Sequence, residues 1–196
     1  MSLAPPEGGA GVDPGLSRLP RVWTAANLLT LLRLAAAPLA AFAVWRGDGR
    51  AALLLFVLAV ATDLLDGPLA RRRGEASALG GLFDHATDAT FVSLGLLACA
   101  ARDLVPLVLP LLVAAAFLQY TLDSRALRGR ALRGSTLGRW NGIAYFVLLG
   151  VPVVRDGVGL GWPPDGLVRA LGWVLVTSTL VSIGMRGRLW LEARRS

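Results

Sequence analysis

Six apolar stretches dominate this chain, and each is long enough to cross a lipid bilayer as a helix. They cover residues 24–45, 51–70, 79–101, 104–122, 138–155 and 166–185. About 20 helical residues span the hydrocarbon core of a bilayer. Hydrophobic residues make up 55% of the 196 residues and charged residues only 17%, so a soluble domain of this size could not bury its apolar surface. The sequence therefore predicts an all-α integral membrane protein with six transmembrane helices.

The N-terminal residues have a different composition, because they are rich in Pro and Gly and lack the apolar core of a signal peptide. We expect residues 1–22 to form a flexible or interfacial cytoplasmic segment. Residues 23–196 then form one six-helix transmembrane domain.

Positive charge is distributed unevenly over the connecting segments. With a cytoplasmic N-terminus, the non-cytoplasmic segments hold Arg46, Arg50, Arg102, Arg155 and Arg169, and all other Arg except Arg33 are cytoplasmic. Cytoplasmic loops carry the excess of basic residues, so both termini are predicted to be cytoplasmic. In so hydrophobic a chain, the net charge of +7 indicates attraction to anionic membrane lipids rather than to nucleic acid.

Four carboxylates lie inside the second and third apolar stretches. Asp63 and Asp66 are three residues apart, and Asp84 and Asp88 are four apart, so each pair shares one helix face. Both pairs fall near the cytoplasmic ends of antiparallel helices and are expected to converge. Converging carboxylates need a compensating charge, and all-oxygen ligands suit Mg²⁺, Mn²⁺ or Ca²⁺. Arg33, inside the first stretch, is predicted to pair with a carboxylate or a phosphate.

Small residues accompany the carboxylates on the same helix faces. Gly67 and Ala70 share the face of the first Asp pair, and Gly80 shares that of the second. They either allow close helix packing or leave room for a ligand. Arg71 follows at the mouth of this region, where a phosphate would arrive.

These residues form the pattern D-x2-D-G-x2-A-R-x8-G-x3-D-x3-D. It is matched by Asp63, Asp66, Gly67, Ala70, Arg71, Gly80, Asp84 and Asp88. The pattern resembles the signature of the CDP-alcohol phosphotransferase (phosphatidyltransferase) family of membrane enzymes. A second element, formed by Asn27, Thr30, Arg33 and Pro38, is similar to the N-x2-T-x2-R-x4-P element of the phosphatidylglycerophosphate synthase-like branch.

The resemblance implies a transferase of phospholipid synthesis, which moves a substituted phosphoryl group from a CDP-alcohol such as CDP-diacylglycerol to an alcohol acceptor and releases CMP. It implies a site with two Mg²⁺ or Mn²⁺ ions held by Asp63, Asp66, Asp84 and Asp88, with Asp88 also the candidate catalytic base. The CDP-alcohol is expected to contact Gly67, Ala70, Arg71, Gly80, Asn27 and Thr30. For Asn27 and Thr30, capping of the first helix is the alternative. The family also implies a homodimer, here in a bacterial inner membrane with the active site facing the cytoplasm.

The identity of the acceptor stays open on the sequence alone. Arg133 and Arg139 belong to a basic cytoplasmic loop and are predicted to bind a phosphorylated acceptor, with attraction to lipid headgroups as the alternative. The run Phe83–His85 is similar to the aminoalcohol phosphotransferase branch, which gives CDP-aminoalcohol transfer as an alternative function. His85 itself is either a catalytic group or a helix-start residue without a role. A cation-coupled transporter is the remote alternative, because intramembrane carboxylates also occur in transporters.

Overall fold

The computed structural model describes residues 25–72, 77–123 and 136–195, and within them the chain is entirely helical apart from short connections. The described helices are α1 (Ala25–Arg46), α2 (Gly49–Arg72), α3 (Ala78–Ala101), α4 (Val108–Asp123), α5 (Thr136–Val158) and α6 (Asp165–Arg195). The predicted fold class is confirmed. The predicted N-terminal segment 1–22 lies outside the described residues.

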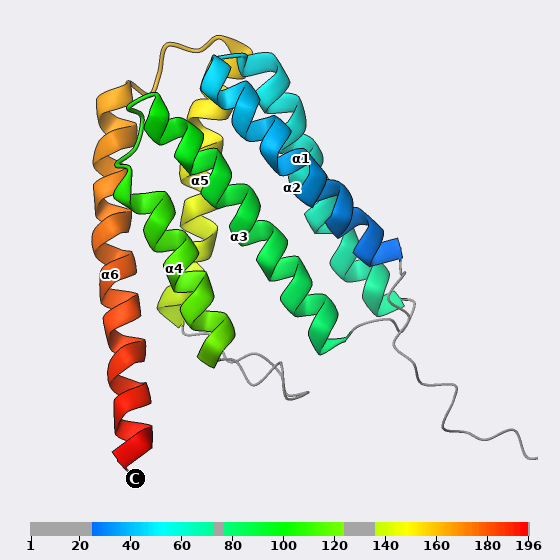
Figure 1. Ribbon diagram of the computed structural model, residues 1–196. Coiled ribbons are helices and arrows are strands. Elements are labelled where there is room, and N and C mark those ends of the chain that lie inside the picture. Colours follow the sequence, from blue (N-terminus) through cyan, green and yellow to red (C-terminus); the bar gives the residue numbers. More distant parts are fainter. Residues whose placement is uncertain (1–24, 73–76, 124–135, 196) are drawn as a thin grey trace, which may run out of the picture.

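The helices form a bundle in which each helix runs opposite to the one before it in the chain (Figure 1). α1 packs against α2 and α3, α2 packs against α5, and α6 packs against α4 and α5. Contacts of α3 with α4 close the ring, and contacts of α3 with α5 cross it. Both ends of the described chain lie at one end of the bundle, together with the end of α2 and the start of α3 (Figure 1).

Each predicted stretch coincides with a helix, and the main differences are at two boundaries. α4 begins at Val108 instead of residue 104 because the chain first makes a compact turn. Asp103 adopts a left-handed φ of 58°, and the backbone N–H of Leu104 donates to the carbonyl oxygen of Cys99 at 3.0 Å. This hydrogen bond is typical of a helix C-terminus. α6 continues beyond the predicted residue 185 to Arg195.

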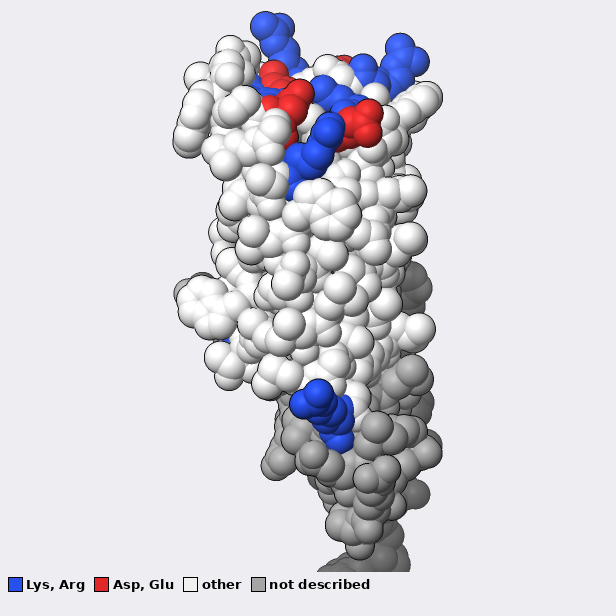
Figure 2. All heavy atoms as spheres, turned by 90° about the vertical axis from the view of Figure 1, so that its left-hand side faces the viewer, with Lys and Arg blue, Asp and Glu red and all other residues white. Residues whose placement is uncertain are grey.

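The outer surface of the bundle is apolar, as a lipid-facing surface must be. Within the described residues, three helices are long and apolar enough to cross a membrane, at Leu28–Arg46, Thr136–Val158 and Asp165–Arg188, and Val108–Thr121 is a shorter apolar helix. Large hydrophobic side chains such as Leu54 and Trp140 are exposed on the outside. Figure 2 shows a broad uncharged band below a charged end of the molecule.

Small residues bring the helices close together. Ala36, Ala37, Ala40 and Ala43 are buried along α1. At the crossing of α2 and α5, a Cβ added to Gly157 would lie 2.6 Å from the Cβ of Leu53 and 2.8 Å from the carbonyl oxygen of Gly49. Only glycine permits this approach of two backbones.

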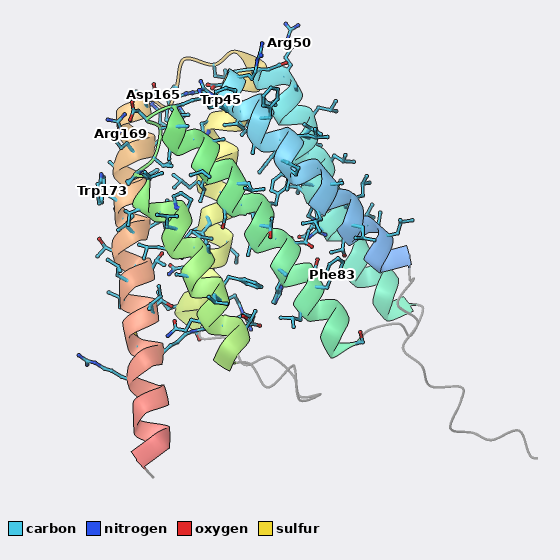
Figure 3. The ribbon with its side chains drawn as sticks, viewed as in Figure 1. Trp45, Arg50, Phe83, Asp165, Arg169 and Trp173 are labelled. Atoms are coloured by element: carbon cyan, nitrogen blue, oxygen red, sulfur yellow. The ribbon has the colours of Figure 1, made fainter. Side chains whose placement is uncertain are left out.

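An ion-pair network joins the connecting segments at the end of the bundle that carries Arg50, Asp165 and Arg169 (Figure 3). Arg155 contacts Asp156 at 2.9 Å and Asp165 at 2.6 Å. Arg102 contacts Asp156 at 3.1 Å. The network links the end of α3, the end of α5 and the start of α6. It stabilises the end of the bundle opposite to the end of α2 and the start of α3.

Candidate active site

Three of the four motif carboxylates meet around one guanidinium. Nη1 of Arg33, on α1, donates to Oδ1 of Asp63 at 2.9 Å and to Oδ1 of Asp84 at 3.0 Å, and it also contacts Oδ1 of Asp88. Arg33 is 1% exposed. The predicted convergence of these three carboxylates, and the predicted pairing of Arg33 with a carboxylate, are confirmed. Asp66 lies on α2 one turn after Asp63, and its side chain lies outside the described residues.

Helix geometry explains why the carboxylates meet. α2 runs toward the end of the bundle where α3 begins, so residues near the end of α2 reach the same depth as residues near the start of α3 (Figure 1). The start of α3 is fixed by Ser77, whose side chain accepts a hydrogen bond from the backbone N–H of Gly80 at 3.0 Å. Such an N-cap stabilises the first turn. Phe83, next to Asp84, marks this region in Figure 3.

The charge balance of this cluster suits a divalent cation. Three carboxylates against one guanidinium leave two net negative charges in a region that is partly shielded from water. The side chains of Asp63, Asp84 and Asp88 are 39%, 28% and 25% exposed, so a cation can reach them. One ligand atom each of Asp84, His85 and Asp88 lie within 4.8 Å of one another. Carboxylate oxygens are the ligands that Mg²⁺ and Mn²⁺ favour.

A cavity of about 540 Å³ opens beside the cluster, between α3, α4, α5 and α6. Asp88 and His85 border it on α3, and Arg139 and Arg186 border it on α5 and α6. The rest of its wall is mostly apolar and includes Val92, Val113, Phe117, Tyr145, Phe146 and Ile183. Asp88 therefore belongs both to the carboxylate cluster and to the wall of a cavity large enough for a substrate.

Comparison with known proteins assigns the chain to a family. The family model for CDP-alcohol phosphatidyltransferase matches residues 23–183, which include the whole carboxylate cluster and most of the cavity wall. The chain belongs to the CDP-alcohol phosphatidyltransferase family. It is a transferase, and the predictions of family, enzyme class and integral membrane protein are confirmed.

Similar proteins come from bacteria and from mammals. The cardiolipin synthase (CMP-forming) of Streptomyces coelicolor is 32% identical over 178 residues, which cover 86% of this chain and 82% of that protein. The CDP-diacylglycerol–glycerol-3-phosphate 3-phosphatidyltransferase of Cereibacter sphaeroides is 28% identical over 151 residues, or 69% of this chain and 66% of that protein. The cardiolipin synthase (CMP-forming) of Rattus norvegicus is 36% identical over 92 residues, which cover 46% of this chain and 30% of that protein. No solved structure matches the chain.

The second sequence motif, formed by Asn27, Thr30, Arg33 and Pro38, lies on α1. Because α1 begins at Ala25, neither Asn27 nor Thr30 occupies the N-cap position, and the alternative that they cap this helix is wrong. Thr30 is 3% exposed, on the helix that also carries Arg33. The side chain of Asn27 lies outside the described residues.

The remaining predicted residues divide into those that the structure places and those that it does not. Arg139 borders the cavity, as expected for a residue near the start of the fifth span, and Gly80 lies in the first turn of α3. Gly67, Ala70 and Arg71 lie in the last turns of α2, but the side chains of Ala70 and Arg71 are outside the described residues. Arg133 is also outside the described residues.

Several cavity residues were not predicted from the sequence as functional. Gln119 and Tyr120 lie on α4, Asn141 on α5, and Ser182 and Arg186 on α6. Asn141 is 4% exposed, and its Oδ1 accepts a hydrogen bond from the hydroxyl of Ser178 at 2.6 Å. Polar residues inside apolar helices were the available signal, because each must find a partner or a ligand in the membrane.

Proposed function

We propose that this chain transfers a phosphatidyl group from CDP-diacylglycerol to the hydroxyl group of an alcohol acceptor and releases CMP. The observation that carries the proposal is the convergence of Asp63, Asp84 and Asp88 at one end of the bundle, beside a cavity that Asp88 also borders. A donor at the carboxylate cluster and an acceptor in the cavity would then meet at Asp88.

The donor side of the site is a proposed metal site. We assign the ligands as Asp63, Asp66, Asp84 and Asp88, and we expect two ions, Mg²⁺ or Mn²⁺. When bound, such ions neutralise the diphosphate and stabilise the oxygen that leaves with CMP. Gly67, Ala70, Arg71, Gly80, Asn27 and Thr30 are the proposed contacts of the cytidine diphosphate.

Asp88 is the proposed general base. Its carboxylate accepts the proton of the acceptor hydroxyl, whose oxygen forms a new bond to the β-phosphorus of the donor. The bond between that phosphorus and the oxygen of CMP breaks. Arg33 donates a hydrogen bond to the Asp88 carboxylate, which keeps this carboxylate in the cluster. Asp88 also borders the cavity. A base must lie within hydrogen-bond reach of the proton that it takes, and the position of Asp88 on the cavity wall supports this role for an acceptor hydroxyl bound there.

The cavity suits an acceptor that is both anionic and lipidic. Arg139 and Arg186 supply positive charge for a phosphate, and the apolar wall formed by residues such as Phe117 and Phe146 suits hydrocarbon. Phosphatidylglycerol has both features, and a second phosphatidyl group on its free hydroxyl gives cardiolipin, the product in the name of the Streptomyces relative. Glycerol 3-phosphate is the second candidate, because the two Arg would also bind its phosphate and the Cereibacter relative is named for it.

We also propose that both termini and the active site face the cytoplasm, in a bacterial inner membrane, and that the chain forms a homodimer. Both ends of the described chain lie at the site's end of the bundle (Figure 1), and most of the Arg residues fall in segments on that side. The positive-inside rule supports this orientation.

The test measures CMP release and the lipid product. Purified full-length protein is incubated with CDP-diacylglycerol, Mn²⁺ and either phosphatidylglycerol or glycerol 3-phosphate, and the product is identified by mass spectrometry. We expect acceptor-dependent CMP release and cardiolipin formation. Phosphatidylglycerophosphate as the product would select the second candidate. Absence of CMP release with every acceptor would refute the proposed activity.

Asp84→Asn is the matching variant, and it should lower CMP release by about a hundredfold or more, because a metal ion stabilises the transition state by several kcal/mol. Asp165→Asn makes the same chemical change at the opposite end of the bundle, where Asp165 is 60% exposed, and should leave CMP release unchanged. Full activity of Asp84→Asn, or of the wild type in excess EDTA, would contradict the metal assignment.

A further inference from the structure

His85 lies between two carboxylates of the cluster in the chain, and it is the single histidine of the protein. It follows Asp84 directly and precedes Asp88 by three positions on α3, so His85 and Asp88 share one helix face. An imidazole nitrogen of His85 lies within 4.8 Å of an oxygen of each of these carboxylates. His85 is exposed and borders the same cavity as Asp88.

The imidazole packs against an aromatic ring from another helix. The ring of Tyr120, on α4, lies 5.8 Å from the ring of His85, centroid to centroid. The guanidinium of Arg186, on α6, lies over the Tyr120 ring, 5.3 Å from its centroid. A cation over an aromatic face is attracted to it. Tyr120 is therefore a positioning residue for His85.

The distances are compatible with one ion bound by all three side chains. Two donors at about 2.1 Å from one octahedral ion lie about 3.0 Å apart when adjacent and about 4.2 Å apart when opposite. Rotation of the exposed imidazole would bring its nitrogen into this range. Arg33 contacts Oδ1 of both Asp84 and Asp88. Each carboxylate has a second oxygen, Oδ2, that can face the ion while Oδ1 keeps the guanidinium.

We propose that His85 is a nitrogen ligand of the divalent cation held by Asp84 and Asp88. The proposal rests on the metal site given under the proposed function and adds a ligand to it. Carboxylate oxygen suits both ions, but Mn²⁺, as a first-row transition metal, accepts an imidazole nitrogen more readily than Mg²⁺ does. With a nitrogen in its ligand set, the site binds Mn²⁺ in preference to Mg²⁺.

The experiment uses Mn²⁺ as a spectroscopic probe of its own ligands. Full-length protein, purified without a polyhistidine tag, is loaded with Mn²⁺ and studied by pulsed electron paramagnetic resonance, with and without CDP. Because the chain has one histidine, a ¹⁴N coupling that becomes a ¹⁵N coupling on labelling with ¹⁵N-histidine identifies His85. We expect this coupling in the wild type and in Tyr120→Phe, which keeps the packed ring, and its loss in His85→Ala.

Metal affinity gives a second readout. We expect His85→Ala to weaken Mn²⁺ binding about tenfold or more, the range known for altered metal surroundings, and to change Mg²⁺ binding much less. Alanine favours a helix and His85 is exposed, so the variant should fold. Bound Mn²⁺ without any histidine coupling, with and without CDP, would overturn the proposal and leave the Asp site and the activity standing. No Mn²⁺ binding together with no CMP release would overturn both.

Discussion

Replacement of Arg33 by Met tests the electrostatic core of the site. Arg33 is 1% exposed and its Nη1 contacts three carboxylates. Without the guanidinium, three like charges face one another in a region of restricted solvent. Removal of one partner of a buried ion pair costs about 3–5 kcal/mol. Because the carboxylates of Asp63, Asp84 and Asp88 are 25–39% exposed, we expect the lower figure, about 3 kcal/mol, in the absence of metal.

A divalent cation should compensate for much of this loss. Removal of Arg33 changes the net charge of the cluster from two negative charges to three, so the variant should bind a cation more tightly than the wild type. At about 100 times the dissociation constant, a ligand stabilises the folded state by about 2.7 kcal/mol. The stabilisation by Mn²⁺ should therefore be larger in Arg33→Met than in the wild type.

The measurement is thermal unfolding in detergent, with EDTA or with Mn²⁺. In EDTA, about 3 kcal/mol corresponds to a Tm lower by about 6–12 °C for a chain of this length. Arg102→Met is the matched control, because Arg102 also pairs with a carboxylate, that of Asp156, but is 29% exposed at the opposite end. It should lower stability by about 1 kcal/mol or less, with no response to Mn²⁺. An Arg33→Met variant with wild-type Tm in EDTA, or with a wild-type response to Mn²⁺, would refute this reasoning.

Two other predictions concern packing and the acceptor. Gly157→Leu should lower the free energy of unfolding by about 3 kcal/mol or more, because the new Cβ would lie 2.6 Å from that of Leu53. Gly184→Ala on α6 is the control: no atom lies within 4 Å of the added Cβ, so it should be neutral or stabilising by about 1 kcal/mol. Equal stability of the two variants in thermal unfolding would contradict the packing. The double variant Arg139→Gln, Arg186→Gln should have a higher KM for the acceptor and a nearly unchanged KM for CDP-diacylglycerol. An unchanged acceptor KM in steady-state kinetics would show that these two Arg do not bind the acceptor.

The helices of this protein could be predicted closely from the sequence because the bilayer imposes a length on each apolar stretch. The boundary of α4 could not, since it depends on the turn at Asp103 and on the burial of Leu104 and Val105 against other helices. The family also followed from the sequence, because the motif fixes eight residues at fixed spacing.

The carboxylate half of the site was accessible to sequence reasoning as well. Helical spacing places Asp84 and Asp88 on one face, and antiparallel neighbours place Asp63 at the same depth. The common partner of these residues, Arg33, comes from a third helix, and the sequence left open whether a carboxylate or a phosphate would pair with it. Only the packing of α1 against α2 and α3 decided that it contacts all three carboxylates.

The cavity half of the site depended on tertiary structure. Arg186 was predicted only as a cytoplasmic positive charge, Tyr120 was not predicted to be functional, and His85 was left open between a catalytic role and none. Contacts between α3, α4 and α6 bring these three residues together around one cavity. Local sequence determines which face of a helix a residue occupies. Which helix lies opposite that face is decided by the order of packing around the bundle, and this order depends on close contacts, such as that between Gly49 and Gly157, that no single helix specifies by itself.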